Sequence, residues 1–280
     1  MAIKEKFKHN QSYKEKSMFT INDLFKLSKF IYNTGLFFKE KITLVKNIQV
    51  YKMINRNKKL VNYKTSDTCY ICGNGPSLKK VNIDNLCGDL IVVNDYFRFG
   101  SEFIKRPTYY LILDDIYGQV GYEDRLKSLL ESFTDVPLIL PASLYRVTKE
   151  DIASEREIYY YCPWGKLFKA GQEIDFTKVV SRTWNVVSQA IVLAMSLGYK
   201  RIVLLGCDYN LFATNTLQHC YDSDDGTIRP NLLEMLYKYC FTTDIHYEIA
   251  KEASRRSIEI ENATADSLLD AYPISKGEIY

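Results

Sequence analysis

Residues 68–78 read Thr-Cys-Tyr-Ile-Cys-Gly-Asn-Gly-Pro-Ser-Leu, a short apolar run followed by a glycine-rich turn. This order is typical of a buried strand that ends at a ligand-binding turn. Gly73 and Gly75 would let backbone N–H groups approach a phosphate or a ribose, and Ser77 would cap the next helix. The third glycine of the dinucleotide fingerprint and the Lys-Ser/Thr ending of a P-loop are both missing. The stretch therefore predicts a nucleotide held in another manner.

Similar apolar runs recur along the chain and alternate with helical segments. Strands are expected at residues 68–72, 90–93, 109–113, 137–140, 201–205 and 257–261. Helices are expected at about 185–197, 231–239 and 244–256. This alternation predicts an α/β fold, namely a Rossmann-like, mainly parallel sheet with helices on both faces. We expect this nucleotide-binding domain to span residues 66–280.

Polar residues stand just after the ends of several expected strands. They are Asn74, Asn94, Asp95, Asp114, Asp115 and Asp208. In open α/β sheets ligands bind at this edge. Any one of these residues would also suit a helix cap or a turn. Their recurrence at one edge favours a binding site.

The charge of the chain is unevenly distributed. The 280 residues carry a net charge of +3, with 37 Lys and Arg against 34 Asp and Glu. Residues 1–65 hold 15 of the basic and 4 of the acidic residues, a balance of +11, which leaves −8 for residues 66–280. An acidic body argues against nucleic acid as a partner, because such proteins present a basic face.

The seven cysteines show no spacing typical of a disulfide framework. Cys69 and Cys72 lie three apart in an expected strand and so point to opposite faces, which disfavours a zinc or redox pair. No secretory signal opens the chain, and no apolar run reaches the roughly 20 residues that span a bilayer. We therefore expect a cytoplasmic protein with reduced thiols.

The segment 1–65 is a basic, amphipathic unit separate from the main domain. Apolar residues recur at helical spacing over 18–50, and Gly35 is expected to divide them into two helices. Residues 1–52 could lie on an anionic membrane, such as the inner face of the cytoplasmic membrane. Equally, the apolar stripe could pack on the main domain or on a second copy of the chain. Residues 53–65 are interpreted as a polar linker.

Several motifs, taken in order, resemble one protein family. They are Gly73–Leu78, Asn94-Asp95-Tyr96-Phe97, Ser196–Ile202 leading into Gly206-Cys207-Asp208-Tyr209, Thr243-Asp244-Ile245, and Ser267-Leu268-Leu269. Together they resemble the bacterial sialyltransferases of the Campylobacter lipooligosaccharide type over about residues 68–270. The resemblance implies a GT-A-variant, Rossmann-like domain with a mobile lid, here about residues 209–242. It also implies an inverting, metal-independent transfer from a CMP-activated sialic acid or related nonulosonate to a bacterial surface glycan.

The resemblance also implies roles for individual residues. Asn74 and Gly75 would lie near the donor's phosphate and ribose, Asn94 and Asp95 would face the cytidine, and His219 would be the general base. Other donor-binding candidates are Gly73, Ser77, Asp114, Asn185, Asp208 and Tyr209. The chain departs from the family at two places. The family's Thr-Ser-Gly is replaced by Asn185-Val186-Val187. Asn210 stands where the first of the two lid tyrosines that hold the departing phosphate in the family is expected, so Tyr209 or Tyr221 would have to bind the phosphate instead.

The chemistry of sugar transfer gives independent support to His219. An acceptor hydroxyl must lose its proton, and a histidine that titrates near neutrality suits this role. The other two histidines are His9, in the basic segment, and His246, which is expected to be a surface or packing residue. Arg182 and Arg229 are candidates for the phosphate, although either could be a plain surface charge.

Alternative functions remain open from the sequence. The cluster Asp222-Ser223-Asp224-Asp225 could hold Mg²⁺ or Mn²⁺, as could Asp114-Asp115, although we expect no metal and no cofactor besides the CMP-sugar substrate. A pyrophosphokinase-like enzyme and a non-catalytic nucleotide- or glycan-binding module are the alternatives to a glycosyltransferase. The expected partners are the CMP-sugar donor and a glycan or glycolipid acceptor.

Overall fold

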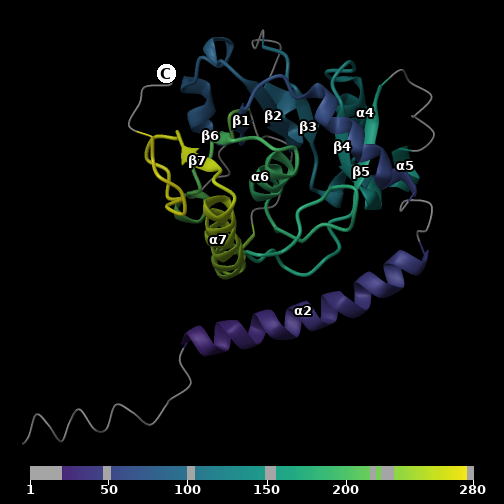
Figure 1. Cartoon of the computed structure of the whole chain (residues 1–280), viewed down its shortest axis with the longest axis vertical. Coiled ribbons are helices and arrows are strands. Elements are labelled where there is room, and N and C mark those ends of the chain that lie inside the picture. The colour runs from purple at the N-terminus through teal and green to yellow at the C-terminus, as the bar shows by residue number, and fades with distance from the viewer. Residues whose placement is uncertain are drawn as a thin grey trace, which may run out of the picture.

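The computed structural model describes residues 21–46, 52–99, 105–148, 156–214, 219–221 and 230–275. Its centre is a seven-stranded sheet in the order β5-β4-β3-β2-β1-β6-β7, in which every pair of neighbours is parallel (Figure 1). The strands are β1 (Thr68–Cys72), β2 (Asp89–Val93), β3 (Tyr109–Leu111), β4 (Leu138–Pro141), β5 (Ile158–Tyr161), β6 (Arg201–Leu205) and β7 (Glu259–Asn262). The predicted Rossmann-like α/β fold is confirmed.

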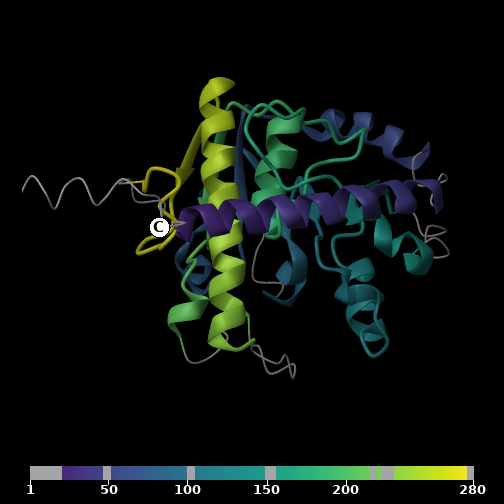
Figure 2. The same ribbon diagram turned by 90° about the horizontal axis from the view of Figure 1, so that it is seen from below.

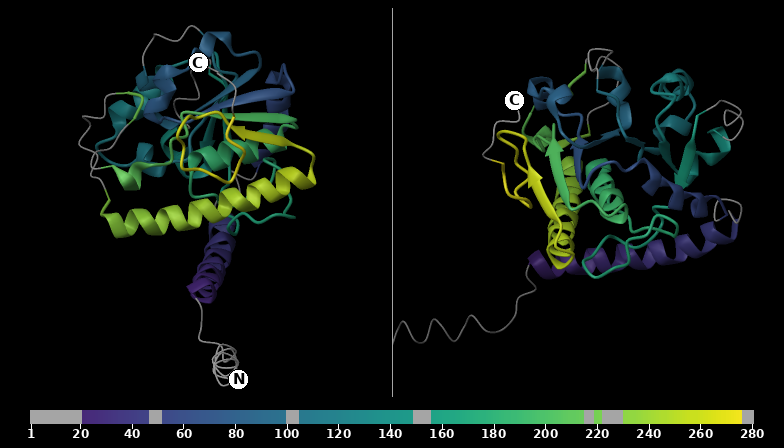
Figure 3. Two further views of the ribbon diagram at one scale, coloured as in Figure 1. Left: turned by 90° about the vertical axis from the view of Figure 1, so that its left-hand side faces the viewer. Right: turned by 45° about the horizontal axis from the view of Figure 1, so that its top comes forward.

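Helices and short 3-10 segments cover both faces of the sheet. The α-helices are α2 (Ile21–Lys46), α4 (Glu123–Glu131), α5 (Tyr145–Thr148), α6 (Val186–Ser196) and α7 (Leu232–Arg255). The 3-10 segments are η2 (Asn55–Tyr63), η3 (Pro76–Lys80), η4 (Ile83–Asn85), η5 (Asn94–Phe99), η6 (Asp115–Gly118), η7 (Ala142–Leu144) and η9 (Leu211–Ala213). Helices α6 and α7 lie against one face, and η3 and α4 against the other (Figures 1 and 3).

Strand β1 runs through the middle of the molecule because its side chains are apolar on both sides. Cys69 and Ile71 belong to the core beside α6, whereas Tyr70 and Cys72 belong to the opposite core. The two cysteines therefore face opposite ways, as their spacing predicts, and all seven cysteines are free. A strand buried on both faces reads as a continuous apolar run instead of an alternating one.

The strand order reverses at β1. The chain builds outward from β1 through β2 to β5 and then returns to place β6 on the other side of β1. The register aligns Cys72 with Val92 on one neighbour and with Leu205 on the other. The turns that follow these three strands therefore emerge at one edge, at the switch point where α/β sheets bind ligands.

Two expectations about helices are wrong. Helix α2 continues through Gly35, which therefore does not divide it. The two helices expected at 231–239 and 244–256 are one helix, α7. Thr242, at the expected break, contacts the carbonyl oxygens of Lys238 at 2.9 Å and Tyr239 at 3.2 Å through its hydroxyl. A threonine whose hydroxyl is satisfied in this way fits inside a helix.

The segment expected to be a polar linker is packed against the main domain. Ile54 and Leu60 are fully buried. The Asn57 amide is buried as well and donates to the carbonyl oxygens of Tyr160 and Phe176, both at 2.7 Å. Residues 55–63 thus form the 3-10 segment η2 as an integral part of the fold.

Helix α2 packs on the main domain through one of its sides (Figure 2). The ring of Phe25 lies 5.2 Å from that of Phe241, and Lys29 pairs with Asp244. The indole N–H of Trp184 donates to the Tyr32 hydroxyl at 2.7 Å. The opposite side of α2 is apolar and faces solvent. It carries Leu24, Leu27, Phe30 and Ile31, between 46% and 69% exposed.

The glycine-rich turn is locked to the end of β6 by backbone contacts. The Gly73 N–H donates to the Leu205 carbonyl at 2.8 Å, and the Gly75 N–H donates to the Gly206 carbonyl at 2.9 Å. A Cβ added to Gly73 would lie 2.6 Å from the Gly206 oxygen. The N–H groups of Gly73 and Gly75 themselves are therefore occupied by β6 and the turn after it, so a backbone N–H that approaches a phosphate or a ribose here has to be another one.

We expect Gly73→Ala to destabilise the fold by about 1–3 kcal/mol, the usual cost of forcing extra volume into a packed region. The reason is that the Cβ would meet backbone atoms, which cannot rotate away. Chemical denaturation measures the loss. Gly35→Ala is the matched control, since its Cβ meets nothing within 4 Å and the site is helical. It should stabilise by about 0.5–1 kcal/mol. If Gly73→Ala has the same free energy of unfolding as the wild type, the close approach of the two backbones is not required for stability.

Candidate active site

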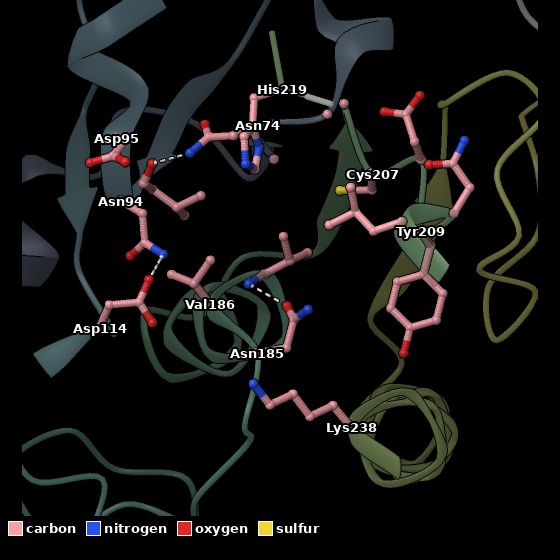
Figure 4. Close-up of a pocket in the computed structure, with 18 of the residues that line it drawn as sticks. Asn74, Asn94, Asp95, Asp114, Asn185, Val186, Cys207, Tyr209, His219 and Lys238 are labelled. Atoms are coloured by element: carbon pink, nitrogen blue, oxygen red, sulfur yellow. Dashed lines mark hydrogen bonds between the residues drawn. The ribbon is translucent and has the colours of Figure 1, made fainter. Parts of the chain in front are cut away.

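A cavity of about 620 Å³ lies at the switch-point edge of the sheet (Figure 4). Its size falls within the range of small-molecule sites. Sequence-predicted residues among its lining are Gly73, Asn74, Gly75, Asn94, Asp95, Asp114, Asn185, Asp208, Tyr209, His219 and Tyr221. Ser77 and Arg182 are not among the lining residues. Arg229 lies outside the described residues.

Two asparagine side chains connect the ends of neighbouring strands at the cavity (Figure 4). The Asn74 amide donates to the Val93 carbonyl at 3.1 Å. Asn94 donates to the Asp114 carboxylate at 2.6 Å and accepts from the Leu113 N–H at 3.2 Å. Its φ of 44° lies in the left-handed region, where asparagine is tolerated better than most residues. The amides thus hold three successive strand ends, β1 to β3, in fixed register.

The Asn74 side-chain oxygen has no partner of its own. The atom is buried and finds no hydrogen-bond partner within the described parts of the chain. A buried carbonyl oxygen without a partner costs about 1–3 kcal/mol. Asn74 lines the cavity, so a ligand hydroxyl or amino group would satisfy this oxygen.

The Asp95 carboxylate is engaged by other side chains beside the cavity. It is 2% exposed and accepts from the Tyr117 hydroxyl at 2.6 Å. The Arg125 guanidinium pairs with both of its oxygens, one of them through Nε at 2.9 Å. The Tyr221 hydroxyl lies 3.4 Å from the same carboxylate. A buried charge held this way is satisfied, so Asp95 acts chiefly as a link between η5, α4 and the segment 219–221.

His219 lies over the cavity, held by its neighbours in the segment 219–221. Its ring stacks on Tyr221, with centroids 4.9 Å apart and planes 15° from parallel. The Arg98 guanidinium lies over that tyrosine ring at 4.8 Å. The Cys220 N–H donates to the Asn74 carbonyl at 2.9 Å, which ties the segment to the glycine-rich turn. The imidazole is thereby held in the same cavity as Asn74 (Figure 4).

Ser77 does not cap a helix, contrary to expectation. The residue at the cap position of η3 is Gly75, and no side chain caps that segment. The Ser77 hydroxyl instead donates to the Asp208 carboxylate at 2.7 Å. This bond joins the turn after β1 to the turn after β6, so Ser77 helps to hold the cavity residue Asp208 in place without lining the cavity itself.

The two tyrosines that were candidates for the donor phosphate direct their hydroxyls at protein groups. The Tyr209 hydroxyl lies 2.6 Å from that of Thr242 and 3.0 Å from that of Thr243, and so points toward α7 (Figure 4). Burial raises its pKa, so the hydroxyl stays protonated near neutral pH. Tyr221 directs its hydroxyl to Asp95. Both hydroxyls therefore already have protein partners in this arrangement.

The amino end of α6 also faces the cavity. Asn185 caps this helix, since its side-chain oxygen accepts from the Val187 N–H at 2.7 Å and the Ser188 N–H at 3.2 Å. The first turn of a helix favours a nearby anion. Arg182 precedes this helix but does not line the cavity. Its backbone pairs with Lys166 and Phe168.

Helix α7 contributes cavity residues that were not among the sequence predictions. Lys238, Tyr239 and His246 from this helix line the cavity. His246 is fully buried, and burial lowers its pKa to about 3, so the imidazole is neutral. The buried residues Met235, Thr242, His246 and Ile249 recur at helical spacing. That periodicity was obscured because the sequence was interpreted as two helices.

Asp114, which lines the cavity, has a pKa raised above its ordinary value. Its side chain reaches solvent in the cavity, but desolvation by the surrounding protein, followed by repulsion from Asp115, raises its pKa above 3.8. Lys238 opposes this shift. The ionised form of Asp114 is thus less favourable in the folded chain than in the unfolded one.

We expect Asp114→Asn to raise Tm at pH 7 by about 1–2 °C. The substitution removes a carboxylate whose ionisation opposes folding, and an amide oxygen can still accept from Asn94. Because the folded-state pKa is raised, the gain is present above that pKa and vanishes as the pH falls below 3.8. Thermal unfolding from pH 3.5 to 8 measures it, with the exposed Asp84→Asn as control. A gain that persists at pH 3.5 would contradict the electrostatic explanation.

The described residues form neither a cluster of metal ligands nor a membrane-spanning helix. There, no three or more His, Cys, Asp or Glu side chains gather in a way that could hold a metal ion. The cluster Asp222–Asp225 lies outside the described residues. No helix in the described ranges has the length and apolar character needed to cross a bilayer.

Comparisons with known proteins found similar solved structures. No protein-family model and no curated protein matches the chain. The monofunctional alpha-2,3-sialyltransferase Cst-I from Campylobacter jejuni is 16% identical, with a TM-score of 0.47 over 75% of this chain and 80% of that one. The sialyltransferase CstII from Campylobacter jejuni, in complex with cytidine-5'-monophosphate, is 16% identical, with a TM-score of 0.47 over 76% and 86%. These proteins are of the group that the sequence motifs resemble.

Proposed function

We propose that this chain is a glycosyltransferase that uses a CMP-activated sugar, a sialic acid or related nonulosonate. The observation that carries the proposal is the convergence of Asn74, Asn94 and His219 on one cavity at the switch point. Asn74 offers its unpartnered side-chain oxygen to a nucleoside, Asn94 holds the strand ends beside it, and His219 offers a base. The ordered sequence motifs that resemble bacterial sialyltransferases support the same activity. The acceptor is proposed to be a bacterial surface glycan or glycolipid.

In the proposed mechanism the acceptor hydroxyl attacks the anomeric carbon from the side opposite to CMP. The bond to the phosphate oxygen breaks, CMP leaves with the electron pair, and the configuration inverts. The His219 imidazole takes the proton of the attacking hydroxyl. CMP leaves as a phosphate monoester, which needs no proton from an acid. The resemblance to the sialyltransferases further supports a reaction independent of a metal ion. Activity that survives EDTA is the expected result.

We expect His219→Ala to lower transfer by about 10²–10⁴-fold, the usual contribution of a general base. CMP binding should stay near that of the wild type, because Asn74 and Asn94 remain. Turnover is measured with CMP-N-acetylneuraminate, and CMP binding by thermal shift. Added imidazole should restore part of the rate if the residue acts as a base.

The same thermal-shift assay tests the nucleotide. CMP, CDP, UDP, GDP and ATP are compared, and a ligand present at 1,000 times its Kd stabilises by about 4 kcal/mol. Selection of ATP would favour the pyrophosphokinase-like alternative. Selective binding of CMP without turnover would favour the non-catalytic module. That alternative is tested because the hydroxyls of Tyr209 and Tyr221 are engaged by protein groups. Wild-type turnover in His219→Ala would refute its role as the base.

We also propose that the basic segment, residues 1–52, rests on an anionic membrane surface. The exposed side of α2 supports this, since its four apolar residues lie opposite the side that packs on the main domain. Leu233, Leu236 and Tyr237 on α7 are exposed as well, at 44–63%. The balance of +11 over residues 1–65 suits anionic lipid. A lipid-linked acceptor would then be met at the membrane surface.

We expect full-length protein to sediment with phosphatidylglycerol vesicles and to be released in part by salt, because salt screens charge but not buried apolar side chains. Replacing Leu24, Leu27, Phe30 and Ile31 together by Gln should reduce sedimentation at least tenfold. This variant is preferable to truncation near Tyr63, which would remove the buried Ile54 and Leu60.

Phosphatidylcholine vesicles and the single variant Lys200→Met serve as controls for that experiment. Equal sedimentation of the wild type and the fourfold variant would contradict the membrane proposal. The apolar side would instead be a contact between copies of the chain if the wild type does not sediment with vesicles and the fourfold variant forms a smaller oligomer in solution than the wild type.

A further inference from the structure

The cavity is richer in carboxylates than in cations, although the proposed donor is an anion. Asp114, Asp115 and Asp208 line it together with Asp95. The described lysines and arginines of the lining are Arg125 and Lys238. The Arg125 guanidinium is bound to the Asp95 carboxylate. A ligand phosphate or carboxylate would therefore depend on Lys238 for its counter-charge.

Lys238 is placed where such an anion would also meet a helix terminus. It projects from α7 toward the amino end of α6, near Asn185 (Figure 4). That helix is 11 residues long, and the partial positive charge at its first turn adds to the charge of the lysine. Among the described residues, Lys238 makes no ion pair within 4.0 Å. Its ammonium is thus available to a ligand.

A second group in the same cavity lacks a partner. His246 is 0% exposed and lines the cavity, and its Nδ1 lies 2.9 Å from the Tyr272 hydroxyl. Its other nitrogen, Nε2, is buried and has no hydrogen-bond partner within the described ranges. Buried polar atoms are almost always paired in native proteins, so this nitrogen independently indicates a polar ligand group in the cavity.

We propose that Lys238, assisted by the amino end of α6, forms a subsite for an anionic oxygen group of the donor, in the cavity where the buried His246 Nε2 also lacks a partner. This proposal rests on the proposed function and adds to it, because it states which residues neutralise the donor. The group is either the phosphate of CMP or the carboxylate of the transferred sugar. In either case the ammonium offsets the charge of the nearby carboxylates, which would otherwise repel the donor.

The subsite is tested by calorimetric titration of three probes: cytidine, CMP and CMP-3-fluoro-N-acetylneuraminate. Wild type is compared with Lys238→Met and with Lys238→Arg, which keeps the charge. Lys251→Met is the control, since Lys251 is an exposed lysine on the same helix that pairs with Glu248. Lys238 is exposed, so its substitution should leave the fold intact.

If the subsite holds the phosphate, Lys238→Met weakens CMP at least tenfold and leaves cytidine unchanged. If it holds the sugar carboxylate, only the fluorinated CMP-sugar is weakened to that extent. In both cases Lys238→Arg retains most of the affinity, and Lys251→Met all of it. If the wild type binds CMP and Lys238→Met binds each of the three probes as tightly as the wild type does, the subsite is overturned and the proposed function is not. A wild type that binds none of the probes overturns the proposed function and the subsite with it.

Discussion

The close approach of the turn after β1 to the turn after β6 is the constraint on which the rest of the site depends. Gly73 and Gly75 donate their N–H groups to Leu205 and Gly206, and no side chain fits between the two backbones. The contact closes the sheet at the point where its strand order reverses. It leaves Asn74, between the two glycines, with its side chain directed across to β2.

The second determinant is a buried charge. Asp95 has little access to water, so it must be paired, and Arg125 and Tyr117 satisfy it. The same carboxylate lies near the hydroxyl of Tyr221, on whose ring His219 stacks. A residue at the end of β2 thereby helps to position a histidine that is 124 positions later in the sequence. Removing Asp95 would take from the half-buried Arg125 guanidinium the carboxylate that it pairs with.

Helix α7 couples the cavity to the basic segment. One side of it supplies Lys238, Tyr239 and His246 to the cavity. Another side carries Phe241 and Asp244, which hold Phe25 and Lys29 of α2. The same helix, α7, therefore contacts both α2 and the cavity of the proposed donor site. One side of α2 packs on the main domain, which is one of the two expectations for the N-terminal stripe, and the other side is exposed.

The sequence by itself determined the α/β class, most strand positions and the edge at which polar residues gather, because apolar runs and the residues that end them are local signals. It missed β5, whose Tyr160 and Tyr161 are buried only because their hydroxyls reach Thr148 and Ile112. Only the tertiary structure decided which polar groups are already engaged. The amides of Gly73 and Gly75, the Ser77 hydroxyl and the Asp95 carboxylate looked available for a ligand, whereas Lys238 and His246 did not. Hydrogen-bond partners far apart in the chain make that difference, and no local pattern encodes them.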